Sequence, residues 1–165
     1  MSLSPNDKKE FRSELAAYCR LAEANEARWH YSQHRPFGGY APVAPQSYHW
    51  ADCSAYAGSL VWYWAMKHTG VFVSDGLGCK YSGYGNTSTA LAFFKDHHAP
   101  QDKFRVGDVA IYGTASDTEH MTVCRKAGTA STAVFSSFGQ EAGPLATELH
   151  YRGDLVGVYR HPALL

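Results

Sequence analysis

The spacing of the apolar residues changes once along the chain, and this change restricts the folds that the sequence can adopt. Before Pro100, apolar residues recur mainly at helical spacing, with segments rich in glycine and proline between the helices. After Pro100 they alternate, which predicts strands at residues 106–112, 120–125, 132–138 and 155–160. Helices followed by strands indicate an α+β fold with an antiparallel sheet in the C-terminal half.

The first predicted helix has a clear start signal. Ser4 is a favourable N-cap, Pro5 suits the first helical position, and Asp7 stands at the capping-box position. An apolar stripe then carries the helix to about Trp29; its members are Phe11, Leu15, Tyr18 and Ala22. Residues 31–51 follow, and their glycines and prolines predict a long irregular loop that covers a site.

A second helix is predicted to begin at Asp52, a good N-cap residue, with Cys53 in its first turn. It runs to about His68 and is stopped by Gly70. Its apolar face continues from Cys53 through Ala57, Leu60, Val61 and Trp64. The positive end of the helix dipole favours the thiolate form of a cysteine placed there, and thiolate is the nucleophilic form. The alternative for Cys53 is a buried core cysteine.

Residues 71–86 are predicted as loop with at most one short strand, and Asn86 begins a short helix that ends before Pro100. His120 then opens one of the predicted strands. Alternation places His120, Thr122 and Cys124 on one side of that strand. A histidine on a strand is usually a surface or core residue, but together with Cys53 it suggests a nucleophile and its base.

Composition and charge exclude several classes of function. Fifteen basic residues balance fifteen acidic ones, so a nucleic acid is not an expected partner. The cysteines have no CxxC spacing, which favours free thiols over a zinc or disulfide site. We expect no membrane span, because no apolar window is long enough. The N-terminus lacks the apolar run of a secretory signal, which predicts either a protein made in the cytoplasm or a chain whose leader has been removed.

Three motifs follow one another along the chain: Asp52-Cys53-Ser54, the segment 105–112 with its Gly-Asp pair, and the segment 119–123, which contains His120. Their order resembles that in the NlpC-type cell-wall cysteine peptidases of the papain-like superfamily. Phe37-Gly38-Gly39 is similar to the aromatic-Gly-Gly sequence that precedes the cysteine in that family. The resemblance covers roughly residues 31–160, and residues 136–144 are similar to a stretch of phage-encoded members.

The resemblance implies a papain-like fold in which the nucleophile helix packs on the C-terminal sheet. The expected organisation is a single catalytic domain over residues 1–162, with an extra N-terminal helix at 1–30, a peptidase core at 31–160 and a possible linker beginning at 163–165. The implied function is hydrolysis of an amide bond in bacterial peptidoglycan, as an endolysin peptidase domain made in the host cytoplasm and acting on the wall. A monomer is expected, with no cofactor.

The resemblance also assigns roles to individual residues. Cys53 would attack the peptide carbonyl, and His120 would pass the proton to the leaving amine. The Cys53 backbone N–H would contribute to an oxyanion hole, with Tyr31 or Tyr40 as a second donor. Asp52 and Ser54, which flank the nucleophile, complete the expected oxyanion and substrate group. Glu119 is predicted to point away from His120 and is left out of the chemistry.

The group that orients His120 is predicted to lie across a hairpin from it. A turn centred on Gly128, or just after it, would set residue 136 or 137 opposite His120, on the same sheet face. Ser137 is the favoured candidate, because Ala133 and Phe135 at alternate positions look core-facing. Ser136 is the alternative if a bulge shifts the pairing, and Gln140 and Glu141 are the reserve candidates.

Two other classes of function remain open. One is a metal-dependent amidase with ligands among His30, His34, His97, His98 and Asp102. The spacing of His30 and His34 is suitable, but no H-E-x-x-H motif accompanies it, so no metal is expected. The other is a non-catalytic wall-binding module that keeps the fold and its aromatic residues.

Overall fold

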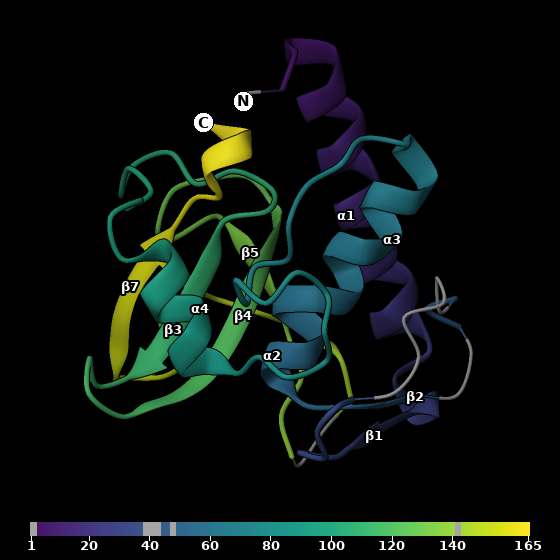
Figure 1. The fold of residues 1–165 in the computed structure, drawn as a ribbon. Helices are drawn as coiled ribbons and strands as arrows, with labels where there is room; N and C mark the ends of the chain where they lie inside the picture. The colour runs from purple at the N-terminus through teal and green to yellow at the C-terminus, as the bar shows by residue number, and fades with distance from the viewer. Residues whose placement is uncertain (1–2, 38–43, 47–48, 141–142) are drawn as a thin grey trace.

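The computed structural model describes residues 3–37, 44–46, 49–140 and 143–165, and it has the predicted α+β arrangement (Figure 1). The C-terminal half forms an antiparallel five-stranded sheet in the order β6-β5-β4-β3-β7. Its strands are β3 (Val109–Gly113), β4 (Thr118–Lys126), β5 (Val134–Ser137), β6 (Leu145–Thr147) and β7 (Leu155–Tyr159).

Helix α1 (Pro5–Ala24) begins as predicted, because the Ser4 side chain accepts a hydrogen bond from the backbone N–H of Asp7. Its end differs from the prediction, which placed it near Trp29. The α-helix stops at Ala24, where Asn25 caps it, and a short 3-10 turn, η1 (Glu26–Arg28), follows. Trp29 already belongs to a strand, and its buried ring packs against those of Tyr18 and Tyr56.

The cysteine-bearing helix also has the predicted limits, although it is not a regular α-helix throughout. It consists of α2 (Cys53–Ala55), a π-helical segment η2 (Tyr56–Leu60) and α3 (Val61–Thr69). Gly70 ends it in the left-handed conformation, with a φ of 69° that favours glycine. α3 lies alongside α1, and the two helices cover the same side of the sheet (Figure 1).

The segment 31–51 is not wholly irregular, so that prediction is wrong in part. A short parallel pair joins β1 (Trp29–Tyr31) to β2 (His49–Ala51), with Tyr31 opposite Ala51. This pair holds the chain entering the cysteine helix against the chain leaving α1. Between the cysteine helix and α4 (Thr87–Phe94), residues 71–86 contain no helix or strand.

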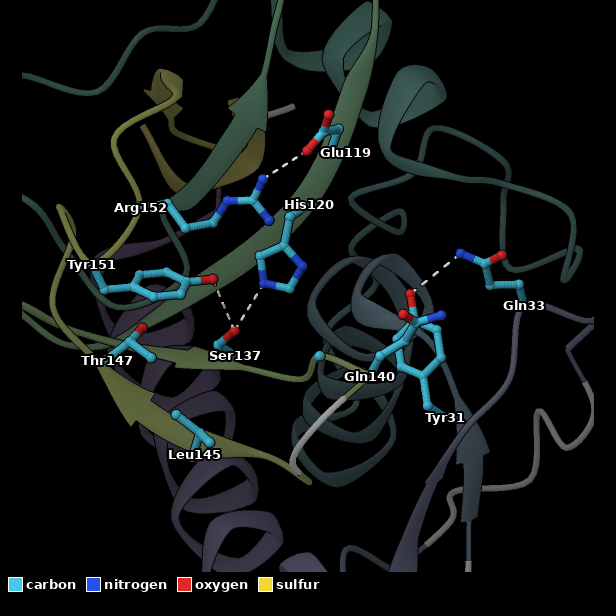
Figure 2. Close-up of a pocket in the computed structure, with 11 residues that line it drawn as sticks. Tyr31, Gln33, Glu119, His120, Ser137, Gln140, Leu145, Thr147, Tyr151 and Arg152 are labelled. Carbon is cyan, nitrogen blue, oxygen red and sulfur yellow. Dashed lines mark hydrogen bonds and ion pairs between the residues drawn. The ribbon is translucent and has the colours of Figure 1, made fainter.

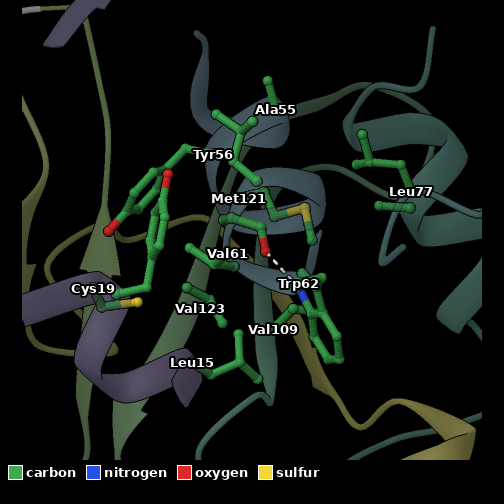
Figure 3. Close-up of a cluster of buried hydrophobic side chains, with 14 of the residues drawn as sticks. Leu15, Cys19, Ala55, Tyr56, Val61, Trp62, Leu77, Val109, Met121 and Val123 are labelled. Carbon is green, nitrogen blue, oxygen red and sulfur yellow. Dashed lines mark hydrogen bonds between the residues drawn. The ribbon is translucent and has the colours of Figure 1, made fainter. Parts of the chain in front are cut away.

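The hydrophobic core lies between the helices and one face of the sheet (Figure 3). Val109, Met121 and Val123 reach it from the strands, and Tyr56, Val61 and Trp62 reach it from the cysteine helix. A smaller cluster, which includes Ala110, Tyr112, Cys124 and Phe135, covers the opposite face. Strand alternation therefore divides β3 and β4 between two apolar layers.

The two ends of the described chain meet at one side of the molecule (Figure 1). The guanidinium of Arg12 donates to the carbonyl of Leu164 at 2.6 Å, and Leu164 is buried in the main core. Residues 163 and 164, where the sequence allowed a linker to begin, thus pack against α1. No helix among the described residues is long and apolar enough to cross a membrane.

Candidate functional site

Cys53 occupies the first turn of the cysteine helix, where its position is set by Asp52. One carboxylate oxygen of Asp52 accepts hydrogen bonds from the backbone N–H of Ala55 at 2.8 Å and from the Ser54 hydroxyl at 3.0 Å. This is the predicted N-cap, and it fixes the helix start in space. The Cys53 side chain is buried, with only 4% of its surface exposed.

Arg35 holds the other oxygen of Asp52, a contact that the sequence did not predict. Its guanidinium lies 2.6 Å from the carboxylate and also donates to the Ser54 hydroxyl at 3.1 Å and to the carbonyl of Gly85 at 2.8 Å. Arg35 thereby ties the loop before the cysteine helix to the turn before α4. Ser54 contributes to this network, and its own side chain is buried.

The thiol lies where β5 separates from β4. β5 ends at Ser137, which pairs with Thr122, and the backbone of Met121, the residue before Thr122 in β4, lowers the pKa of Cys53 by hydrogen bonding. The thiol is also 4.0 Å from the hydroxyl of Thr87, the first residue of α4. Two helix starts and a strand backbone thus surround the sulfur, next to the strand residue that carries the imidazole.

His120 and Thr122 lie on one face of β4 as predicted, and this is the face away from the cysteine helix. Nε2 of His120 is 2.8 Å from the Ser137 hydroxyl, and Nδ1 is directed away from Ser137 (Figure 2). Among the described residues, no hydrogen bond joins His120 to Cys53. The imidazole is 7% exposed.

Two adjoining clefts contain these side chains. The larger, which we call the histidine cleft, has a volume of about 580 Å³ and is lined by His120, Ser137 and Tyr151 among others. The smaller, the cysteine cleft, has a volume of about 200 Å³ and is lined by Cys53 and Thr87 among others. Tyr31, Gln33 and Glu119 line both clefts, so the thiol and the imidazole open onto neighbouring parts of one surface.

The predicted register of the β4–β5 hairpin is wrong by two residues, although the predicted face is right. Ser137 pairs with Thr122 and Ser136 pairs with Val123, instead of either serine facing His120. The strands extend to Lys126 and Val134, with a bulge near that end, so the turn centres later than Gly128. A shift of two residues preserves the face, and Ser137 reaches His120 diagonally. Ser136 points to the other side, where it hydrogen-bonds to Tyr56.

The remaining predicted residues fall in different places. Tyr31 lies across the histidine cleft from His120, and its hydroxyl accepts from Gln33 at 3.3 Å (Figure 2). Gln140 also lines the histidine cleft. Tyr40 and Glu141 lie outside the described residues.

Glu119 lines both clefts, which alternation alone did not predict. A bulge pairs Tyr112 with His120 but Gly113 with Thr118, so Glu119 is the extra residue of β4. Its carboxylate is 2.8 Å from the guanidinium of Arg152. Arg152 also forms a two-point contact with Asp154, at 2.9 and 2.6 Å. The charged rim of the histidine cleft therefore comes from β4 and from the loop before β7.

The electrostatic environment of Cys53 opposes the predicted thiolate. Burial first, and then the negative charge of Asp52, raise the pKa of the thiol, and the hydrogen bond from the Met121 backbone lowers it, which leaves a pKa of about 11. The backbone N–H of Ser54 at the helix start does lower the pKa of Cys53, but burial outweighs it, so the thiol is not a thiolate in the resting site. The same carboxylate that positions the cysteine disfavours its ionisation.

The imidazole is also neutral at pH 7. Burial lowers the pKa of His120 to about 4, and the positive charge of Arg152 acts in the same direction. Asp154 and Asp52 raise the pKa of His120, but they do not outweigh burial. A neutral imidazole can accept a proton, so the site rests as a neutral thiol beside a neutral base.

The residues of the metal-dependent alternative are spread over the molecule. The ring of His30 lies 4.9 Å from that of Trp50, and the His34 side chain is exposed. His98 packs 4.7 Å from Tyr159, next to β7, and Asp102 is exposed. Over residues 3–37, 44–46, 49–140 and 143–165, no group of three or more His, Cys, Asp or Glu side chains is placed to hold a metal ion.

Comparison of the chain with protein-family models, with curated proteins and with solved structures found no match. Function is therefore inferred from the geometry of the site and from the sequence motifs that form it.

The buried histidines predict a loss of stability in mild acid. The pKa values of His120 and His161 are both lowered to about 4 from an ordinary value of 6.5, mainly by burial. Between pH 6.5 and 4 the unfolded chain binds more protons at these positions than the folded chain. The contribution of each histidine to the free energy of unfolding is thus fully present above pH 6.5 and is lost as the pH decreases. At pH 5 the loss is about 2 kcal/mol per histidine.

Urea unfolding at pH 7 and pH 5 measures this effect. We expect His120→Gln to show a smaller difference between the two pH values than the parent protein. His34→Gln, which changes an exposed histidine, should retain the parent difference. Equal stability of the parent at the two pH values would contradict the assignment of neutral buried imidazoles.

Proposed function

We propose that this protein is a peptidoglycan hydrolase that cleaves an amide bond of the bacterial wall peptide by a cysteine–histidine mechanism. The observation that carries the proposal is the position of Cys53 at a helix start, in a cleft that adjoins the cleft of His120. The motifs at 52–54, 105–112 and 119–123 resemble those of the NlpC-type peptidases. Residues of the first and third motifs line the two clefts, and the second motif contains most of β3, which pairs with β4.

The finer assignments are part of the same proposal. The fold is of the papain-like kind, with the nucleophile helix on the antiparallel sheet and the base on a neighbouring strand. The protein acts as a monomeric endolysin peptidase domain, made in the cytoplasm of a phage-infected host and active on the wall. Its substrate is the peptide part of peptidoglycan, without a metal or cofactor.

The chemistry follows from two neutral groups. The substrate carbonyl lies where the histidine cleft meets the cysteine cleft, close to Tyr31. The Cys53 sulfur bonds to the carbonyl carbon while its proton moves to Nδ1 of His120. His120 then donates this proton to the leaving amine, the C–N bond breaks, and a thioester remains. A water molecule, deprotonated by His120, hydrolyses the thioester and regenerates the thiol.

The pKa values indicate when the proton moves. Burial raises the pKa of Cys53 and lowers that of His120, so the neutral thiol and neutral imidazole are favoured at rest over a thiolate–imidazolium pair. Proton transfer must therefore accompany attack, when the negative charge passes from sulfur to the carbonyl oxygen.

That oxygen would be stabilised by the Cys53 backbone N–H at the helix start. The Tyr31 hydroxyl, which borders both clefts, is the second candidate donor.

A third cleft extends the surface beyond Cys53. It lies between α4 and the turn that joins β3 to β4, has a volume of about 520 Å³, and shares Ser88 and Thr118 with the cysteine cleft. The hydroxyls of these two residues hydrogen-bond at 2.9 Å. A peptide bound across the three clefts would be contacted on both sides of the scissile bond, as an extended wall peptide requires.

A non-catalytic wall-binding module is the second candidate. It is favoured by the neutral, buried state of Cys53 and by the missing hydrogen bond between the described thiol and imidazole. The two candidates differ in whether the purified domain changes its substrate. Mass analysis of fragments released from purified wall would show cleavage and would also identify the bond.

Substitution of the nucleophile distinguishes these candidates. We expect Cys53→Ala to reduce wall lysis more than a thousandfold, because no other cysteine lines the three described clefts. Cys79→Ala is the matched control, since Cys79 is half-buried and lies outside the two clefts; it should retain most of the parent rate. Lysis should be measured as loss of turbidity of purified wall, with circular dichroism to verify folding. A folded Cys53→Ala protein with parent activity would exclude the cysteine mechanism.

Chelation tests the metal-dependent alternative. We expect prolonged dialysis against a strong chelator to leave the lysis rate within twofold of the untreated rate, because the proposed chemistry uses only side chains. The measurement should include a zinc-dependent amidase as a positive control for chelation. Loss of activity that added zinc restores would favour the alternative.

A further inference from the structure

Tyr151 extends the contact between His120 and Ser137 into a chain of three side chains. The Ser137 hydroxyl lies 2.8 Å from Nε2 of His120 and 3.3 Å from the Tyr151 hydroxyl (Figure 2). The ring of Tyr151 also meets that of His120 edge-on, with centroids 6.3 Å apart and an interplanar angle of 76°. Neither the motifs nor the strand pattern indicated Tyr151, which lies in the loop between β6 and β7.

The surroundings of Tyr151 hold it in this position. Its ring packs edge-on against Tyr112 at 5.5 Å, and the Tyr112 hydroxyl donates to the carbonyl of Leu149 in the same loop at 2.8 Å. The next residue, Arg152, is held by Glu119 and Asp154. The loop is thus fixed to β3 and β4 on both sides of Tyr151. A tyrosine supported in this way is pre-organised toward Ser137.

A serine is an ambiguous partner for a catalytic histidine, because a hydroxyl both donates and accepts hydrogen bonds. If Ser137 donates to Nε2, the proton of the neutral ring lies on Nδ1, and Nδ1 cannot accept the thiol proton. If Ser137 accepts from Nε2–H, Nδ1 is free to act as the base. After proton transfer both ring nitrogens carry protons, so Ser137 must accept from Nε2–H in the charged state.

In that state the proton of Ser137 needs another acceptor. Ser137 is only 5% exposed, and a buried hydroxyl without a partner is costly. The Tyr151 oxygen is within reach, and Tyr151 is 43% exposed, so its own proton can be donated to water. The chain from Nε2–H through Ser137 to Tyr151 then runs in one direction and ends at solvent.

We infer that Tyr151 is a positioning residue that accepts a hydrogen bond from the Ser137 hydroxyl and thereby keeps His120 in the tautomer with Nδ1 free. This inference rests on the proposed function for its catalytic consequence, while the tautomer itself is a property of the free protein. The Ser137–Tyr151 pair would act as one unit, in which the phenol oxygen gives the Ser137 hydroxyl a hydrogen-bond acceptor other than Nε2 of His120.

A double-mutant cycle measures this coupling. We expect Ser137→Ala to lower the rate of wall lysis about ten- to a hundredfold and Tyr151→Phe to lower it about fivefold or more, mainly in kcat. Phenylalanine keeps the ring packing and removes only the hydroxyl. Because Tyr151 acts through Ser137, adding Tyr151→Phe to Ser137→Ala should cause no further loss. Tyr84→Phe, which removes an exposed hydroxyl, is the matched control and should retain the parent rate.

Two kinetic results would overturn the inference. One is a parent rate in Tyr151→Phe. The other is a double variant in which the two losses multiply, because independent effects would mean that Tyr151 does not act through Ser137.

The tautomer can be observed without substrate. In the parent protein, the ¹⁵N chemical shifts of His120 at pH 7 should show a protonated Nε2 and an unprotonated Nδ1. Tyr151→Phe should shift this population toward protonated Nδ1. A parent that hydrolyses no wall but shows this response would contradict the proposed function and leave the positioning role intact. Identical shifts in the parent and Tyr151→Phe would overturn the positioning role, whatever the activity.

Discussion

The carboxylate of Asp52 is the interaction on which the rest of the site depends. One oxygen caps the cysteine helix, and the other holds Arg35, which in turn contacts the carbonyl of Gly85. A single group thus fixes the helix start, the loop before it and the turn before α4. The arrangement has an electrostatic cost, because the same negative charge raises the pKa of the adjacent thiol. Placement of the cysteine is favoured here over its ionisation.

The features that the sequence predicts correctly are local. The N-caps at Ser4, Asp52 and Asn86 and the stop at Gly70 each depend on a few neighbouring residues, and all are present in the structure. The missed elements depend on distant partners. β1 and β2 are three residues long and pair across a long loop, and β6 is a short edge strand. None of the three is long enough to show a recognisable alternation of apolar and polar residues.

Within the site, too, the features set by local residues were predicted and those set by distant segments were not. The contact between Ser137 and His120 was predicted although the register was not, because a shift of two residues keeps every side chain on its face. Glu119 was misplaced, because a bulge interrupts the alternation at that residue. Arg35 and Tyr151 reach the site from loops, where no periodicity indicates direction. Their roles become visible only when the segments are brought together.

The π-helical segment η2 lies between Cys53 and α3, and it sets how far Cys53 is rotated about the helix axis relative to α3. The backbone N–H of Val61 bonds to the carbonyl of Tyr56, five residues back instead of four, so the helix contains one residue more than a regular α-helix would. Each residue of an α-helix turns it by about 100°, so this extra residue sets which way the thiol faces relative to α3. In evolutionary terms, a single-codon deletion between residues 56 and 60 would turn Cys53 by about 100° relative to α3, so the length of this segment is tied to the direction of the nucleophile.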